Sequence, residues 1–160
     1  MEIVGNSDVT AVVDYAHTPD GLRSALRALR DHFDGAIWCV FGCGGNRDKG
    51  KRPMMGEIAE QYADHIILTD DNPRNESGEG IVEHIQSGML EPNRCTIIRD
   101  RASAIEAAIN EAESGDVVLV AGKGHETYQE SNGVRLLFSD KNQLRIALQT
   151  RTWSPRGQKH

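Results

Sequence analysis

The chain alternates short apolar segments with longer amphipathic ones, and this alternation constrains its fold more than any other feature. The central apolar segments are rich in β-branched residues and apolar on both faces, which is typical of strands buried in a parallel sheet. We expect strands at residues 10–14, 36–41, 65–69, 95–99 and 117–121, and a weaker edge hairpin at 133–138. Apolar residues at helical spacing predict helices at 19–33, 51–63, 79–90, 101–113 and 141–149. The pattern predicts an α/β, Rossmann-like three-layer domain, with a mostly parallel sheet of about six strands and helices on both faces.

Polar and glycine-rich motifs follow four of the expected strands. Ligands bind at the carboxyl ends of the strands in folds of this class, so these motifs are expected to meet at one edge of the sheet. They are DYAHTPD (14–20), GCGGNRDKGKR (42–52), DDNPRNE (70–76) and GKGHETY (122–128). Asp-Asn-Pro is also a common turn sequence, so the third motif taken alone is equally consistent with a simple turn.

The second motif contains a near match to a phosphate-binding loop. GNRDKGKR (45–52) fits G-x-x-x-x-G-K, but the next position should be Ser or Thr, whose hydroxyl binds magnesium, and here it is Arg52. We therefore interpret the segment as a glycine-rich turn with a basic rim that suits a carboxylate or a phosphate. The rim residues are Arg47, Lys49, Lys51 and Arg52.

Composition excludes several classes of function. A net charge of -6 argues against non-specific binding to nucleic acid or to anionic membranes. No apolar segment approaches the roughly 20 residues that span a bilayer, and the N-terminus lacks the layout of a signal peptide. The cysteines Cys39, Cys43 and Cys95 are odd in number, so we expect reduced thiols and a cytoplasmic protein. Cys39 and Cys43 have no second pair of ligands nearby in the sequence, so we expect no zinc site.

The four motifs, in this order, resemble those of the C-terminal domain of Mur ligases. The segments VVDYAHTPDGL, CVFGCGGNRDKGKRPMMGEIAE, TDDNPR and AGKGHETY carry the resemblance, which extends over residues 1 to 148. It is strongest to the ligases that add the third residue of the peptidoglycan stem peptide. The resemblance implies that residues 1–149 are a Rossmann-like, amino-acid-binding domain and that 150–160 are a polar tail. It also implies that the UDP-binding and central ATPase domains of such an enzyme are absent from this chain.

The chemistry that the resemblance implies is ATP-dependent amide-bond formation in peptidoglycan precursor synthesis. ATP and Mg²⁺ would be bound mainly by the absent central domain, so we expect the isolated chain to be inactive as a ligase. The expected partners are meso-diaminopimelate, the UDP-N-acetylmuramoyl dipeptide and the other two domains of the same enzyme. We expect a monomer that binds neither nucleic acid nor membrane.

The resemblance also implies which residues form the site. The residues expected to bind meso-diaminopimelate are Arg47, Asp71, Asn72, Pro73, Arg74, Gly122 and Glu126, and those expected to face the nucleotide are Asp14 and His17. Arg74 is the most informative, because a guanidinium can bind bidentately the distal carboxylate that diaminopimelate has and lysine lacks. Lys123 and His125 receive no assigned role, and no residue is assigned to catalysis or to a metal.

Two alternatives remain open at this point. One is a domain of a lysine-adding ligase, against which Arg74 argues. The other is a self-standing Rossmann-like module that binds a nucleotide or dinucleotide. That module requires G-x-G-x-x-G after the first strand, which DYAHTPDGL does not supply.

Overall fold

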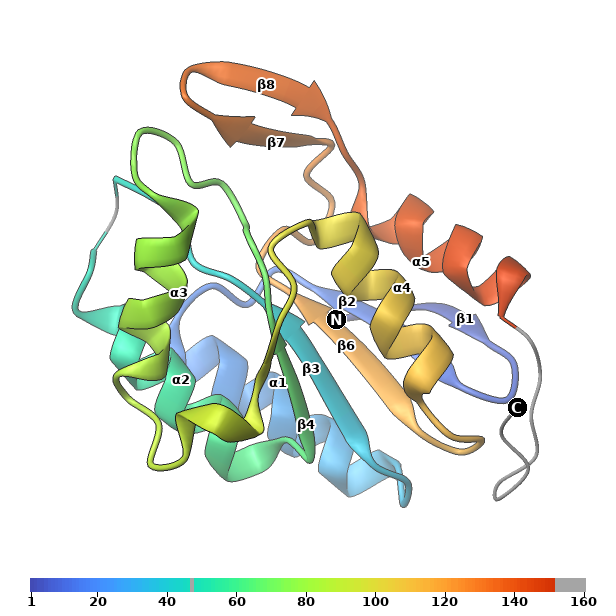
Figure 1. Ribbon diagram of the computed structural model, residues 1–160. Helices are drawn as coiled ribbons and strands as arrows, with labels where there is room; N and C mark the ends of the chain where they lie inside the picture. Colours follow the sequence, from blue (N-terminus) through green and yellow to red (C-terminus); the bar gives the residue numbers. More distant parts are fainter. Residues whose placement is uncertain (47, 152–160) are drawn as a thin grey trace.

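The computed structural model describes residues 1–46 and 48–151, which are built around a six-stranded sheet of order β1-β2-β6-β3-β4-β5 (Figure 1). The strands are β1 (Glu2–Asn6), β2 (Thr10–Asp14), β3 (Ile37–Phe41), β4 (His65–Leu68), β5 (Thr96–Ile97) and β6 (Val117–Ala121). Strand β1 is antiparallel to β2, and the other neighbouring pairs are parallel. The expected fold class is therefore confirmed.

Helices cover both faces of the sheet. They are α1 (Pro19–His32), α2 (Lys51–Tyr62), α3 (Gly78–Gln86), α4 (Arg101–Glu111) and α5 (Asp140–Thr150), with a short 3₁₀ turn at Pro92–Arg94. Helices α1, α2 and α3 share one apolar cluster with the sheet, and α4 and α5 share the other. The two clusters divide along β3 because successive strand side chains point to opposite faces: Phe41 belongs to the first and Val40 to the second.

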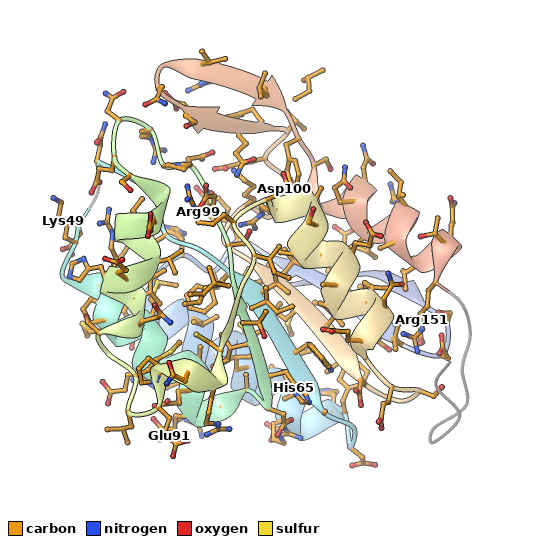
Figure 2. All side chains as sticks on the ribbon, viewed as in Figure 1. Lys49, His65, Glu91, Arg99, Asp100 and Arg151 are labelled. Carbon is orange, nitrogen blue, oxygen red and sulfur yellow. The ribbon has the colours of Figure 1, made fainter. Side chains whose placement is uncertain are left out.

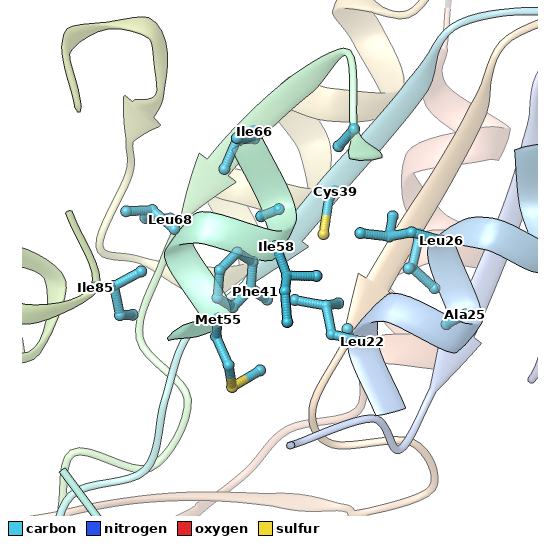
Figure 3. Close-up of a cluster of buried hydrophobic side chains, with 14 of the residues drawn as sticks. Leu22, Ala25, Leu26, Cys39, Phe41, Met55, Ile58, Ile66, Leu68 and Ile85 are labelled. Atoms are coloured by element: carbon cyan, nitrogen blue, oxygen red, sulfur yellow. The ribbon is translucent and has the colours of Figure 1, made fainter. Parts of the chain in front are cut away.

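The first apolar cluster ties the three helices to the strands that precede them. Leu22 of α1, Met55 and Ile58 of α2 and Ile85 of α3 surround Phe41 of β3 (Figure 3). Burying one such side chain stabilises the fold by roughly 1.5–3 kcal/mol. Because each helix is fixed against the sheet in this way, the loops between strand ends and helix starts are held at defined positions.

Helix α2 forms despite a proline and a glycine in its sequence. Pro53 lies in the first turn, where its missing N–H group is not needed for a helical hydrogen bond. A Cβ atom at Gly56 would lie 2.1 Å from the carbonyl oxygen of Ile85, so the glycine allows α3 to pack closely. Gly56 would weaken an isolated helix, but here it strengthens the packing of α2 against α3.

The structure differs from the sequence-based expectation at the margins of the sheet. Strand β1, which was not predicted, covers one edge, and β5 at the other edge has only two residues of the expected 95–99. The expected edge strand at 133–138 is β8 (Val134–Leu137), which pairs with β7 (Tyr128–Ser131) in a separate hairpin beyond the main sheet (Figure 1).

Helix α5 extends one residue beyond the helix expected at 141–149. Thr150 is the last residue of α5, and Arg151 donates to the Asp8 carboxylate at 2.9 Å. Residues 152–160 of the expected tail lie outside the described residues. Across the part of the chain that the structure describes, no helix is long and apolar enough to cross a membrane.

Candidate functional site

Four loops at the carboxyl ends of β2, β3, β4 and β6 surround a cleft of about 560 Å³. These are the loops that carry the four sequence motifs, and the strand order places them side by side. The residues lining the cleft are Tyr15, His17, Thr18, Gly44, Asp48, Lys51, Asp71, Asn72, Arg74, Gly122, Glu126 and Tyr128. A hollow of about 600 Å³ lined by Trp38 and His65 lies toward the opposite end of the strands, and it contains none of the motifs.

The hairpin β7–β8 holds the β4–α3 loop in place. Arg74 has a left-handed backbone, with φ of 54°; its N–H group donates to Glu130 O at 3.1 Å, and its carbonyl accepts from Asn132 N at 2.7 Å. The Arg74 guanidinium donates through Nη1 to Gly45 O at 3.0 Å, and its Nε lies 3.7 Å from the Glu130 carboxylate. Nη2 donates to no residue that the structure describes.

Two glycines allow the loops to meet backbone to backbone. A Cβ atom at Gly45 would lie 1.8 Å from Pro73 O, and the Gly45 N–H donates to Asn72 O at 2.7 Å. Gly122 has φ of +116°, and a Cβ there would meet the Asp71 carboxylate at 2.7 Å. Both positions therefore require glycine for space, and Gly122 requires it for conformation as well.

Lys123 lies fully buried beneath the cleft. Its ammonium is 2.8 Å from Asn72 Oδ1, 3.0 Å from Tyr128 O and 3.1 Å from Asp71 Oδ1. The Glu126 carboxylate lies 3.7 Å away on the same loop. Charges are buried in proteins only when they are paired and hydrogen-bonded, and this ammonium meets both conditions.

Asp70, the neighbour of Asp71, points away from the cleft. Its carboxylate accepts two hydrogen bonds from Arg99, at 2.8 and 3.1 Å. This bonding raises the pKa of Arg99, and Figure 2 shows Arg99 beside the N-terminus of α4. Only the second aspartate of the motif is therefore a cleft residue.

A buried ion pair supports the two loops that contribute most to the cleft. Arg101 donates to both Asp140 oxygens at 2.7 Å, and it also donates to Asp70 O at 3.2 Å and Ala121 O at 3.1 Å. Burial opposes the charge on Arg101, but the Asp140 carboxylate outweighs burial and raises the pKa of the guanidinium. The pair thereby ties the ends of β4 and β6 to the starts of α4 and α5.

The prediction of a basic rim around the glycine-rich turn is only partly correct. Arg52 is 2% exposed and donates to Glu76 at 2.8 Å and to Gly44 O at 2.9 Å, so it braces the loop rather than facing a ligand. Hydrogen bonds from Arg52 and from the Asn46 N–H group lower the pKa of Glu76 to about 2. Lys51 does line the cleft, and its ammonium donates to His17 O at 2.8 Å. Lys49 lies at the margin of the molecule (Figure 2), 3.7 Å from Glu76.

The β2–α1 loop contributes one of its two predicted residues to the cleft. His17 lines it, with Nδ1 2.9 Å from Tyr15 O. The Asp14 carboxylate instead accepts from the Ala16 N–H group at 3.0 Å, within its own turn. Thr18 caps α1 by accepting from Gly21 N at 3.1 Å, as its place before Pro19 predicted.

The described residues offer neither a metal centre nor a reactive thiol. Within residues 1–46 and 48–151, no group of three or more His, Cys, Asp or Glu side chains could hold a metal ion. Cys39, Cys43 and Cys95 are unpaired with one another, and burial raises the pKa of the Cys39 and Cys43 thiols to about 12. The cleft itself is lined by carboxylate, amide, ammonium and guanidinium groups.

Comparison with known proteins identifies the family. Residues 1–124 match the model of the Mur ligase, glutamate ligase domain. The chain belongs to the Mur ligase family. A structure of UDP-N-acetylmuramoyl-L-alanyl-D-glutamate--2,6-diaminopimelate ligase is 45% identical to this Mur ligase domain, with a TM-score of 0.88, over 93% of the chain. The match covers 31% of that ligase, so this domain spans about a third of its length.

More distant structures share the fold of the Mur ligase domain. The murein peptide ligase of Psychrobacter arcticus is 19% identical, with a TM-score of 0.65, and the match covers 95% of this chain and 30% of that one. A bifunctional folylpolyglutamate synthase/dihydrofolate synthase, solved with Mn, AMPPNP and L-glutamate bound, is 20% identical, with a TM-score of 0.59. That match covers 76% of this chain and 27% of the synthase.

Most of the residues predicted for the site of this Mur ligase domain meet at the cleft. Asp71, Asn72, Arg74, Gly122 and Glu126 line it. The Pro73 backbone packs against Gly45 behind the lining, and Arg47 lies outside the described residues. His125 points away, with its Nε2 atom 3.4 Å from Glu2.

Sequence reasoning assigned no role to Tyr128 or Lys123. Tyr128 lines the cleft, its carbonyl accepts from Lys123, and its ring lies 4.2 Å from the Arg135 guanidinium. Both residues belong to the GKGHETY motif, which was the available signal. Lys123 contacts Asn72 and Asp71 of another loop, and Tyr128 contacts Arg135 of β8, and neither set of contacts was visible in the sequence.

Proposed function

We propose that the cleft is the amino-acid site of an ATP-dependent ligase and that its amino acid is meso-diaminopimelate. The observation that carries the proposal is that groups of opposite charge line one cleft: the Arg74 guanidinium, the Asp71 and Glu126 carboxylates and the Asn72 amide together form its wall. A wall of this kind suits a group that is itself zwitterionic. The 45% identity to a 2,6-diaminopimelate ligase supports the same substrate.

Arg74 is proposed to distinguish diaminopimelate from lysine. The distal end of meso-diaminopimelate carries an ammonium and a carboxylate, whereas lysine ends in an ammonium alone. A guanidinium binds a carboxylate through parallel hydrogen bonds, and Nη2 of Arg74 is available for one of them. Asp71 and Glu126 are proposed to accept from the distal ammonium, so that each charge of the zwitterion meets an opposite charge.

The contribution of this domain to the reaction is proposed to be positioning. In the ligase reaction, the substrate amine attacks a carboxyl carbon activated as an acyl phosphate. The C–N bond forms, the C–O bond to phosphate breaks, phosphate leaves with the electron pair, and the nitrogen loses one proton to water. Holding the distal end of the amino acid leaves its other amine directed out of the cleft. Orienting two reactants in this way can lower a barrier by several kcal/mol.

The nucleotide and metal of the reaction are assigned to other domains. The described residues contain no metal-ligand cluster, and the near match to a phosphate loop is interrupted by a buried arginine. When bound, Mg²⁺ would neutralise phosphate charge. His17 and Lys51 are the cleft groups proposed to face phosphate when the domains close. ATP and a UDP-linked peptide as substrates place the proposed reaction in the cytoplasm.

An NMR titration of the chain tests this proposal. We expect meso-diaminopimelate to shift the backbone amides of residues 71–74 and 122–126 at millimolar concentration, because half of a composite site binds weakly. L-lysine should shift the same amides only at higher concentration. Shifts confined to the Trp38–His65 hollow, or equal shifts by both amino acids, would contradict the proposal.

A further inference from the structure

Lys123 occupies an unusual place for a lysine, because it touches the cleft loops without facing the cleft. Its side chain has 0% exposure, so it cannot contact a ligand directly. Its ammonium has three hydrogen donors, and three oxygens lie within 3.1 Å of it: Asn72 Oδ1, Tyr128 O and Asp71 Oδ1. Two of these oxygens belong to side chains that line the cleft.

The orientation of the Asn72 amide follows from these contacts. Asn72 Oδ1 is 2.8 Å from the Lys123 ammonium and 2.9 Å from the Glu130 N–H group. Both neighbours can only donate, so the amide atom that faces them must be the oxygen and not the nitrogen. Nδ2 is therefore turned the other way, and it donates to no residue in the ranges 1–46 and 48–151.

The same ammonium limits the negative charge of the wall. Asp71 Oδ1 lies 3.1 Å and Glu126 Oε1 3.7 Å from Lys123 Nζ, so one buried cation serves two carboxylates. Without it, the two carboxylates would repel each other and the carboxylate of any incoming zwitterion. Lys123 thus influences both the hydrogen-bond donor of the wall, Asn72 Nδ2, and its acceptors, the Asp71 and Glu126 carboxylates.

We propose that Lys123 is a positioning residue for substrate recognition: it turns the Asn72 amide so that Nδ2 presents its N–H donors to the substrate carboxylate, and it holds Asp71 and Glu126 as acceptors for the ammonium. This inference rests on the proposed function, because it specifies how the same wall recognises a zwitterion. It makes a buried lysine that touches no substrate atom responsible for orienting the groups that do.

Two variants separate positioning from simple stabilisation. Lys123→Met removes the ammonium and keeps the length of the side chain. Asn72→Asp keeps an oxygen acceptor for both Lys123 and Glu130 but replaces the outward N–H donors with a second oxygen. Arg151→Met is the matched control, because the Arg151 side chain is only 4% exposed and is also a cation paired with a carboxylate. Its partner, Asp8, lies before the start of β2, and the pair is away from the cleft (Figure 2).

The readouts are the Kd for meso-diaminopimelate by NMR titration, the Asn72 side-chain amide signals and the hydrogen exchange of the Glu130 amide. We expect Lys123→Met and Asn72→Asp each to weaken binding by about tenfold or more, from the loss of hydrogen bonds to a charged group. In the wild-type chain the ligand should shift the Asn72 side-chain signals. Lys123→Met should accelerate Glu130 exchange more than Arg151→Met does.

The outcomes distinguish the inference from the proposed function. If the wild-type chain binds meso-diaminopimelate and both variants bind it equally well, the inference is wrong while the proposed function stands. If the wild-type chain does not bind it, the proposed function fails and the positioning role fails with it. If Lys123→Met and Arg151→Met weaken binding by the same factor and accelerate Glu130 exchange equally, Lys123 acts only through stability and the inference is overturned.

Discussion

Replacing Arg101 by Met should be among the most destabilising single changes in the chain. Arg101 and Asp140 are both 0% exposed, and the two Asp140 oxygens each accept a hydrogen bond from Arg101 at 2.7 Å. Arg101→Met leaves that carboxylate buried without its partner and removes a donor from the Asp70 and Ala121 carbonyls. Breaking a buried pair on one side costs about 3–5 kcal/mol.

Thermal unfolding followed by circular dichroism measures this cost. For a chain of this size, 1 kcal/mol shifts Tm by roughly 2–4 °C, so Arg101→Met should lower Tm by about 6–20 °C. The double variant Arg101→Met/Asp140→Leu should recover much of the loss, because it leaves no buried charge. Arg23→Met is the control: its pair with Asp20 is exposed and should be worth less than about 1 kcal/mol. Equal Tm changes for Arg101→Met and Arg23→Met would refute the role given to the buried pair.

Three further predictions concern the loops and the isolated chain. Because the pKa of Glu76 is lowered from its ordinary value of 4.5 to about 2, the ionised carboxylate stabilises the fold fully above pH 4.5, and this contribution should disappear as the pH falls toward about 2. In urea unfolding between pH 6 and pH 2, Glu76→Gln should therefore lose less stability than the wild type. Gly45→Ala should cost about 1–3 kcal/mol by forcing the Pro73 backbone away, whereas Gly80→Ala, whose nearest neighbour would be 3.7 Å away, should be neutral or stabilising in the same assay. The isolated chain should show no ATP-dependent ligation in a phosphate-release assay, and measurable turnover would contradict the division of labour between domains.

The sheet was predictable because its central strands are recognisable from composition alone. Residues 117–121 are apolar at every position, and a segment of this kind has few alternatives to a buried parallel strand. The hairpin strand Tyr128–Ser131 was not predicted, because its sequence is polar and its partners are the loop at Arg74 and the strand β8. Strands of this sort are determined by tertiary contacts rather than by pattern.

The location of the site was predictable for a similar reason, whereas the roles of its charged residues were only partly so. The rule that loops gather at the carboxyl ends of parallel strands predicted that the motifs containing Asp71, Arg74 and Glu126 would meet, whereas the choice of these residues within the motifs came from the resemblance to Mur ligases. A sequence shows where a charge is but not its partner. Arg52 was therefore interpreted as a rim residue, although its carboxylate partner lies 24 residues further along the chain. Lys123 was left without a role for the same reason.

The affinity ratio between lysine and meso-diaminopimelate, with and without the Arg74 side chain, tests the central claim most directly. Kd values for both amino acids should be measured by NMR titration of the wild-type chain and of Arg74→Met. A hydrogen-bonded charge pair favours diaminopimelate in the wild type by roughly 10- to 100-fold, and the ratio should fall to about one in Arg74→Met. The same change should abolish the selection of diaminopimelate over lysine in kcat/KM of a whole ligase that contains this domain. A ratio that is unchanged by the substitution, with both ligands still bound, would contradict the account.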